Sequence, residues 1–234
     1  MSTPAVLRTT ATGPAQPVDR AGSAGLAEST EPAVPAGLAV LARSRWPDQG
    51  GEELPAIAGF VTSSFSPLAA ALAERCLVSY FGSRPADPAR GDCTAIVLAS
   101  PTGDLVTATA IASAVDEGRR VPPLLFFQSN PNAVAGHIAA RWGLAGPVVC
   151  TIPAGDALAD AIGSATLLIE DAAATAALII VAHAGRSDDT RGVALLLGPQ
   201  SWPAAATPRG DAASPVDTGN PGVAAPAQSG DRTP

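Results

Sequence analysis

The sequence contains no lysine, so all 14 of its basic residues are arginine. Acidic residues number 21, which gives a formal net charge of −7. No part of the chain gathers arginines into the kind of basic stripe that neutralises phosphates, so we expect no nucleic-acid partner. An arginine-only chain rich in Ala, Gly and Pro is typical of a GC-rich coding sequence, such as that of an actinobacterium.

Cysteine is also scarce. Cys76, Cys93 and Cys150 have no C-x-x-C spacing, so the sequence encodes neither a disulfide framework nor a zinc site, and we expect no metal or cofactor. Long apolar runs are missing too, since none reaches the roughly 20 residues that a bilayer span requires. The N-terminus does not read as a secretory signal. These absences predict a cytoplasmic protein that does not bind membranes.

The ordered part of the chain is expected between residues 37 and 200. Residues 1–36 and 201–234 are rich in small residues and proline and have no periodic apolar pattern. Such segments bury too little surface to offset the entropy lost on ordering. We therefore predict one domain with a disordered tail on each side.

Short apolar runs alternate with helical periodicity inside that domain, which is typical of an α/β fold. A loop of a few residues before the last strand forces it to pair antiparallel with the strand before it, in a sheet that is otherwise mostly parallel. Ser66 is expected to cap the first helix, and Leu105, Ala108, Ala112 and Val115 to form the buried face of the second. The predicted strands are 37–42, 94–99, 147–152, 176–182 and 192–197, and the predicted helices are 67–79, 104–117, 133–142 and one that follows the turn at 153–155.

The segment 129–147 carries a family resemblance. Its small-residue helix and Gly-Leu-x-Gly-Pro turn resemble the part of β-ketoacyl synthases that precedes the nucleophile, and Gly59-Phe60, Phe65 to Leu68, Cys76-Leu77 and Gly103-Asp104 are similar to the short, chain-length-factor-like branch of that family. The resemblance covers about residues 37–199, the first half of a full synthase. It implies half of a thiolase-like domain: a five-stranded mixed sheet with helices on its faces and the strand order 3-2-1-4-5.

The sequence departs from active synthases at the nucleophile. The resemblance places a cysteine eight residues after the Gly-Pro turn, at the start of a helix that lowers the thiol pKa and helps to bind an oxyanion. In this chain that position is Gly155, which has no side chain to acylate. The second half of a synthase, which supplies two histidines, is not encoded in the domain either. We therefore lean towards a pseudoenzyme rather than an enzyme.

A few other residues are candidates for chemistry or binding. Cys150 is a weak candidate nucleophile, because a thiol in an apolar strand should have a raised pKa. His137, His183 and Asn132 are candidate binding residues, although His137 fits a core or interface position and His183 has no evident acidic partner. Asp156 is explained as a helix cap, Gly103-Asp104 as a turn and cap, and Arg119-Arg120 as a solvated helix end.

The resulting hypothesis is a catalytically inactive partner subunit, similar to a chain length factor, in type II polyketide or fatty-acid-type biosynthesis. It would form a homodimer, or a heterodimer with a ketosynthase. An acyl carrier protein is a further candidate partner. Two alternatives stay open: an acyltransferase or thioesterase that uses Cys150 or Ser129, and a stand-alone module that binds acyl groups or acyl carrier protein. The resemblance places the strand Val148, Val149, Cys150, Thr151 and Ile152 at a sheet edge, where unpaired backbone groups favour pairing with another chain.

Overall fold

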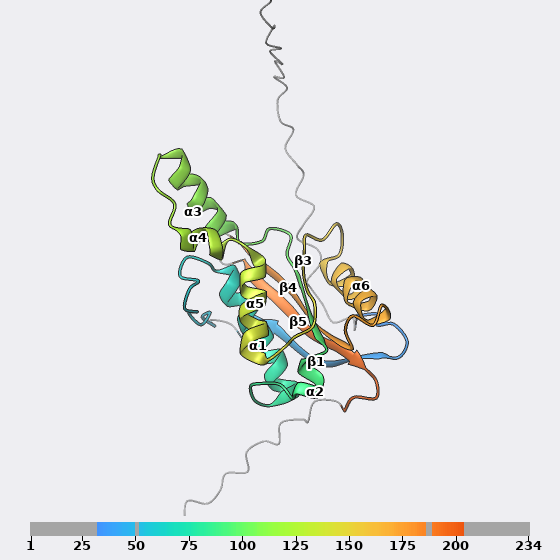
Figure 1. Ribbon diagram of the computed structural model, residues 1–234. Helices are drawn as coiled ribbons and strands as arrows, with labels where there is room; N and C mark the ends of the chain where they lie inside the picture. Colours follow the sequence, from blue (N-terminus) through green and yellow to red (C-terminus); the bar gives the residue numbers. More distant parts are fainter. Residues whose placement is uncertain (1–31, 50–51, 186–188, 204–234) are drawn as a thin grey trace, which may run out of the picture.

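The computed structural model describes residues 32–49, 52–185 and 189–203. They form an α/β domain around one five-stranded sheet (Figure 1). Its elements in chain order are β1 (Leu38–Trp46), α1 (Phe65–Phe81), α2 (Pro88–Gly91), β2 (Thr94–Ala99), α3 (Leu105–Asp116), α4 (Pro123–Gln128), α5 (Pro131–Trp142), β3 (Val148–Thr151), α6 (Ala157–Glu170), β4 (Ala176–Ala184) and β5 (Thr190–Pro199). The predicted fold class is confirmed.

Strand β2 lies inside the sheet and is buried on both faces along its whole length. It pairs in parallel with β3 on one side and with β4 on the other. The apolar run Thr94–Ala99 has no polar face to present to water, so it needs a helical layer above and below the sheet. The predicted bounds of this strand match the structure.

The strand order differs from the one that the resemblance implied. The sheet runs β3-β2-β4-β5-β1, so β1 lies at an edge instead of in the middle. The hairpin of β4 and β5 takes the central place because β4 is buried from Ala176 to Val181 and joins β2 on one side and β5 on the other. The prediction of an antiparallel final strand is confirmed, since β5 runs against both β4 and β1.

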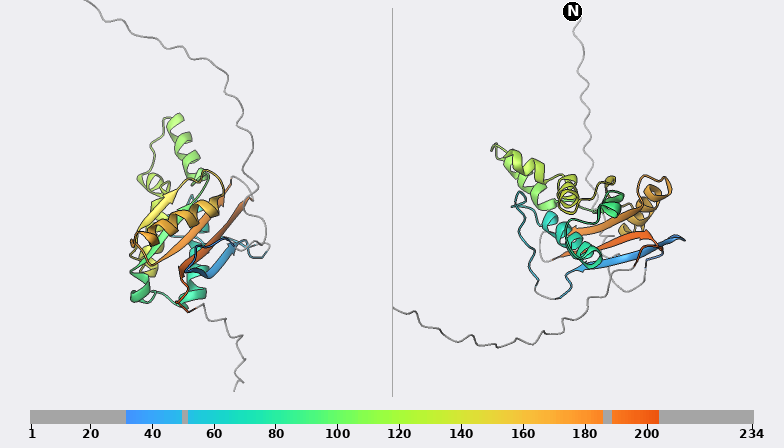
Figure 2. Two further views of the ribbon diagram at one scale, coloured as in Figure 1. Left: turned by 90° about the vertical axis from the view of Figure 1, so that its right-hand side faces the viewer. Right: turned by 60° about the horizontal axis from the view of Figure 1, so that its bottom comes forward.

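Two separate apolar clusters cover the two faces of the sheet. On one face α1 and α5 pack with Leu68, Leu72 and Trp142 in the larger cluster. On the other face α6 packs with Ala161, Ile162 and Ala165 in the smaller one. Figure 2 shows the helices on opposite sides of the sheet, with β1 and β3 as its two edge strands.

The two edges differ in character. Strand β1 is long, carries exposed Arg43 and Arg45, and shifts register between Val40 and Ala42. Strand β3 has only four residues, with the sequence VVCT and no charge. Charges and bulges discourage pairing of an edge strand with another chain, so only β1 carries that protection.

Helix starts show which local predictions were right. Asp104 and Asp156 cap α3 and α6 as predicted: their carboxylates accept hydrogen bonds from the N–H groups of Thr107 (3.1 Å) and Ala159 (2.8 Å). Ser66 is not a cap. Helix α1 begins two residues after Ser63, whose hydroxyl accepts the N–H of Ser66 at 2.8 Å. Several serines lie near this helix start, and each has a hydroxyl oxygen that could accept the bond. Residue type alone therefore did not identify the serine that does so.

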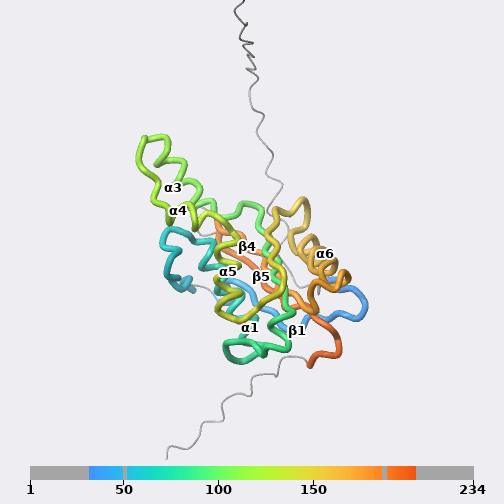
Figure 3. The backbone as a smooth tube through the Cα atoms, in the orientation of Figure 1, coloured from blue at the N-terminus to red at the C-terminus, as the bar shows by residue number. Residues whose placement is uncertain are grey.

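The predicted buried face of α3 is wrong. Only Thr107 and Ala114 are buried in this helix, whereas Ala108, Ala112 and Val115 are exposed. Figure 3 shows why: α3 leads away from the sheet, and the chain returns through α4 towards α5. Apolar spacing marks a face that can be buried, and here no described element covers it.

Packing contacts extend slightly beyond residues 37–200. Val34 packs against the smaller apolar cluster, and Trp202 packs against the larger one and stacks on Tyr80 with ring centroids 6.4 Å apart. The remainder of each predicted tail lies outside the described residues. Within the described part of the chain, no helix is both long and apolar enough to cross a bilayer.

The Gly-Pro turn before β3 generates a stability prediction. A Cβ on Gly146 would lie 2.5 Å from the carbonyl oxygen of Thr94, in the backbone that leads into β2. Because neither backbone can move without disturbing the β2–β3 pair, Gly146→Ala should lower the free energy of unfolding by about 1–3 kcal/mol.

The matched control is Gly163→Ala in α6, where an added Cβ meets nothing within 4 Å. Since alanine favours a helix interior over glycine by about 1 kcal/mol, this variant should be as stable as the wild type or more so. Urea denaturation of both variants measures the difference. Equal effects of the two substitutions would contradict the close-approach explanation.

Candidate functional site

Gly155 lies in the exposed turn between β3 and α6, just before the cap residue Asp156. A Cβ built on Gly155 meets nothing within 4 Å. Its φ is also outside the positive range that favours glycine. Packing therefore does not demand a glycine here, and the absence of a nucleophilic side chain is a property of the sequence rather than a requirement of the fold.

The backbone N–H groups of this turn are already occupied. One carboxylate oxygen of Asp160 accepts hydrogen bonds from the N–H groups of Ala154 (2.9 Å) and Gly155 (3.2 Å). Paired N–H groups at a helix start are the donors that stabilise a developing oxyanion in acyl transfer. Here an internal carboxylate holds them, a feature that the sequence analysis missed. The only sequence signal for this contact was that Asp160 lies four residues after the cap residue of the helix.

None of the three thiols is placed as a nucleophile. Cys76 is fully buried in α1, and desolvation raises its pKa to about 12. Cys150 is half-buried in β3 beside the larger apolar cluster, and burial raises the pKa of its thiol as well. Cys93 donates to the carbonyl oxygen of Arg90 at 3.4 Å. The predicted weakness of Cys150 as a nucleophile is consistent with these positions.

The residues predicted near α5 do not form a catalytic group. His137 is half-buried and packs edge-on against Phe60, with ring centroids 6.0 Å apart. Burial, aided by the charge of Arg141, lowers its pKa and so favours the neutral ring. Asn132 is exposed in the first turn of α5, and the hydroxyl of Ser129 donates to the carbonyl oxygen of Phe126 at 2.8 Å.

His183 does have an acidic partner, contrary to the prediction. Its Nε2 lies 3.1 Å from a carboxylate oxygen of Asp189, which also forms an ion pair with Arg191. Sequence reasoning missed the pair because it depends on the hairpin register, which places His183 opposite Arg191 and Ala184 opposite Thr190. Because Nε2 faces this carboxylate, any proton transfer to a ligand would have to use the other ring nitrogen, Nδ1.

His183 and Gly155 share the carboxyl edge of the parallel strands, where ligands often bind in open α/β sheets. Strand β2 separates their strands in the sheet, so β3 and β4 are about 10 Å apart. The structure thus does not bring the candidate residues into one site. No cluster of three or more His, Cys, Asp or Glu residues suited to a metal occurs in the described ranges. Arg119 is exposed and pairs with Glu117, as expected for a solvated helix end.

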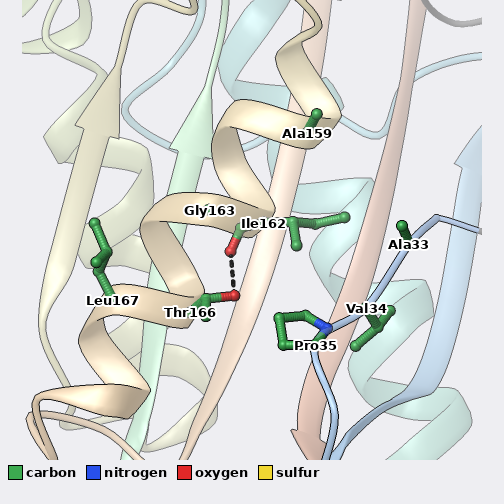
Figure 4. Close-up of a pocket in the computed structure, with 8 residues that line it drawn as sticks. All are labelled: Ala33, Val34, Pro35, Ala159, Ile162, Gly163, Thr166 and Leu167. Atoms are coloured by element: carbon green, nitrogen blue, oxygen red, sulfur yellow. Dashed lines mark hydrogen bonds between the residues drawn. The ribbon is translucent and has the colours of Figure 1, made fainter.

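An open groove of about 670 Å³ lies elsewhere, between α6 and the segment Ala33 to Pro35. Figure 4 shows the side chains on its two walls, with the hydroxyl of Thr166 turned back to the carbonyl oxygen of Ile162 at 2.8 Å. The groove is lined by small and apolar residues and contains no ionisable one, so it offers no acid, base or nucleophile. Its lining consists of Ala33, Val34, Pro35, Ala159, Ile162, Gly163, Thr166 and Leu167.

Comparison with known proteins identifies the fold through structure alone. No protein-family model and no curated protein matches the chain. Among solved structures, one similar chain belongs to a ketosynthase in complex with its chain length factor from Xenorhabdus doucetiae, with 21% identity, a TM-score of 0.50 and 63% of each chain covered. A second is the ishigamide ketosynthase/chain length factor, with 21% identity, a TM-score of 0.53, and 65% of this chain and 49% of that chain covered.

A third is a beta-ketoacyl synthase from Burkholderia phymatum, with 18% identity, a TM-score of 0.53, and 64% of this chain and 46% of that chain covered. The described domain therefore has the thiolase-like fold of ketosynthases, as the sequence resemblance implied. The matched region spans less than two thirds of the Xenorhabdus chain and about half of each of the other two chains.

Thiol reactivity tests this description of the site. At pH 8 we expect a soluble alkylating reagent to modify folded Cys76 and Cys150 more slowly than a free thiol, because the raised pKa of each leaves less thiolate. The rates should rise as the pH increases, and unfolding in urea should make the two thiols react alike. Peptide mapping after timed alkylation provides the measurement. Rapid modification of folded Cys150 at neutral pH would contradict the buried-thiol assignment.

Proposed function

We propose that this protein is a catalytically inactive, ketosynthase-like subunit that pairs with an active ketosynthase in polyketide or fatty-acid-type biosynthesis. The observation that carries the proposal is the turn before α6, where Asp160 holds the N–H groups of Ala154 and Gly155. The family resemblance puts the nucleophile position at Gly155, which has no side chain to acylate. A ketosynthase needs an acylated nucleophile and oxyanion donors at this place. In this chain neither is free for the reaction.

The negative charge of Asp160 adds a second obstacle. A thiolate or an oxyanion at this turn would lie close to a carboxylate, and like charges at short range disfavour each other. The helix N-terminus favours an anion, but Asp156 and Asp160 already supply two. The local electrostatics therefore oppose the chemistry even if a thiol were introduced.

The comparisons support a paired subunit. Two of the similar structures are described as ketosynthases with chain length factors. In the Xenorhabdus case the aligned region covers the same share of both chains, so the two chains are of comparable length. A short thiolase-like chain that works beside a ketosynthase fits these facts better than a self-sufficient synthase.

The edge strand β3 supports pairing as well. Val148 and Ile152, at and just beyond its two ends, are exposed apolar residues, and the strand carries no charge. Val149 and Cys150 instead pack against the two clusters within the domain. We propose that β3 pairs antiparallel with the corresponding strand of the partner, so that the two sheets become continuous.

The first functional prediction concerns condensation. The purified protein should show no condensing activity with an acyl thioester and a malonyl thioester, and Gly155→Cys should fold normally but not restore it. The open space at Gly155 makes loss of the fold an unlikely complication, and circular dichroism checks it. A measurable rate from the wild type, unchanged in Cys150→Ala, would disprove the inactive-subunit proposal.

The second concerns assembly with a full-length ketosynthase from the same organism. Ile152→Arg should weaken the complex, because an unpaired charge buried in an interface costs about 3–5 kcal/mol. Leu167→Arg is the matched control, since Leu167 is also exposed but lies on α6 and not on the β3 edge. Sedimentation of mixtures measures both. A wild type that remains monomeric at high concentration, alone and with the ketosynthase, would contradict pairing through β3.

A further inference from the structure

The hairpin of α3 and α4 presents apolar side chains to water. Phe126 is 74% exposed and Phe127 56% exposed, both in the short helix α4. Val61 lies within the segment that contacts α4 through Thr62, and it is exposed as well. We call the set Val61, Val115, Leu124, Phe126 and Phe127 the hairpin surface.

Helix α4 exposes apolar side chains and also buries an amide nitrogen that has no hydrogen-bond partner among the described residues. The residue after its two exposed phenylalanines, Gln128, is only 1% exposed. Its Oε1 accepts a long hydrogen bond of 3.4 Å from the N–H of Thr62, and its Nε2 finds no partner among the described residues. Apolar rings in water and an unpaired amide in the interior are both unfavourable. A molecule bound over α4 would remove the first of these costs by covering the exposed rings.

The hairpin surface is continuous with the proposed β3 contact. Helix α4 packs against α5, and α5 packs against β3. Figure 1 shows α4, α5 and β3 following one another across the molecule. The outward side of α5 between them carries Asn132, Gly136 and Ala140, which are small or neutral and allow close approach. A partner that binds at β3 can therefore extend over α5 to α4 and meet few charged side chains.

Charge argues for a protein rather than a lipid occupant. The tip of the hairpin contains Asp116, Glu117, Arg119 and Arg120, so its charges balance, and Glu117 pairs with Arg119. An anionic bilayer is bound by basic residues in excess beside the apolar ones, and this tip has no such excess. Exposed aromatic side chains in a mostly uncharged patch are instead typical of the centre of a protein interface.

We propose that the hairpin surface is a second docking contact for the ketosynthase subunit, with Phe126 as its main anchor. The inference rests on the proposed function, because the ketosynthase that would pair with β3 is the same molecule that would cover the hairpin surface. It adds that the affinity depends on α4 and not on strand pairing alone. Phe126 makes no ring contact within the described domain, so its whole exposed surface is available to the partner.

The test compares three single variants of the full chain in titrations with a full-length ketosynthase from the same organism. Phe126→Glu should weaken binding about tenfold or more, as expected for a buried aromatic anchor. Its thermal melting should be close to that of the wild type, because Phe126 is 74% exposed. Leu167→Glu on α6 is the matched control and should bind within about twofold of the wild type. Ile152→Arg reports on the β3 contact separately.

Each outcome decides a different point. If Ile152→Arg weakens binding and Phe126→Glu leaves it unchanged, the hairpin contact is overturned and the proposed function stands. Absence of any wild-type binding would overturn both. A homodimer lost in Phe126→Glu, or binding of the wild type to phosphatidylserine vesicles that Phe126→Glu abolishes, would show that the surface serves another occupant and would overturn the inference as well.

Discussion

The burial of β2 on both faces is the constraint on which the rest of the domain depends. All six of its residues are inside, so its backbone groups must pair with two neighbours and its side chains must meet apolar layers above and below. The parallel pairs with β3 and β4 satisfy the first requirement, and α1, α5 and α6 satisfy the second. The carboxyl ends of these strands then place the turn at Gly155 and the hairpin at His183 along one edge.

The sequence was most informative where one local rule decided the outcome. The continuous run Thr94–Ala99, bounded by turn residues, predicted a buried strand, and the carboxylates of Asp104 and Asp156 stand immediately before helical patterns. It was least informative where the outcome depended on distant partners. Periodicity marks an apolar side of α3 but does not say whether anything covers it, and it does not encode that β5 rather than β2 lies beside β1.

The candidate site shows the same division. The assignment of Gly155 to the nucleophile position comes from counting along one motif, and it stays a prediction. The contact of Asp160 with two backbone N–H groups and that of His183 with Asp189 arise from the shape of a turn and from a hairpin register. Such contacts join residues five or six positions apart through backbone geometry, which residue types alone do not specify.

The unequal edges of the sheet limit how large an assembly can grow. Strand β1 bends at Val40/Ala42 and exposes two arginines, so it is a poor template for a further chain. Strand β3 is the open edge. When two chains join through their open edges, both outer strands of the combined sheet are protected ones. In the proposed pair, addition would then stop at two, and the open β3 edge would not lead on to a fibre.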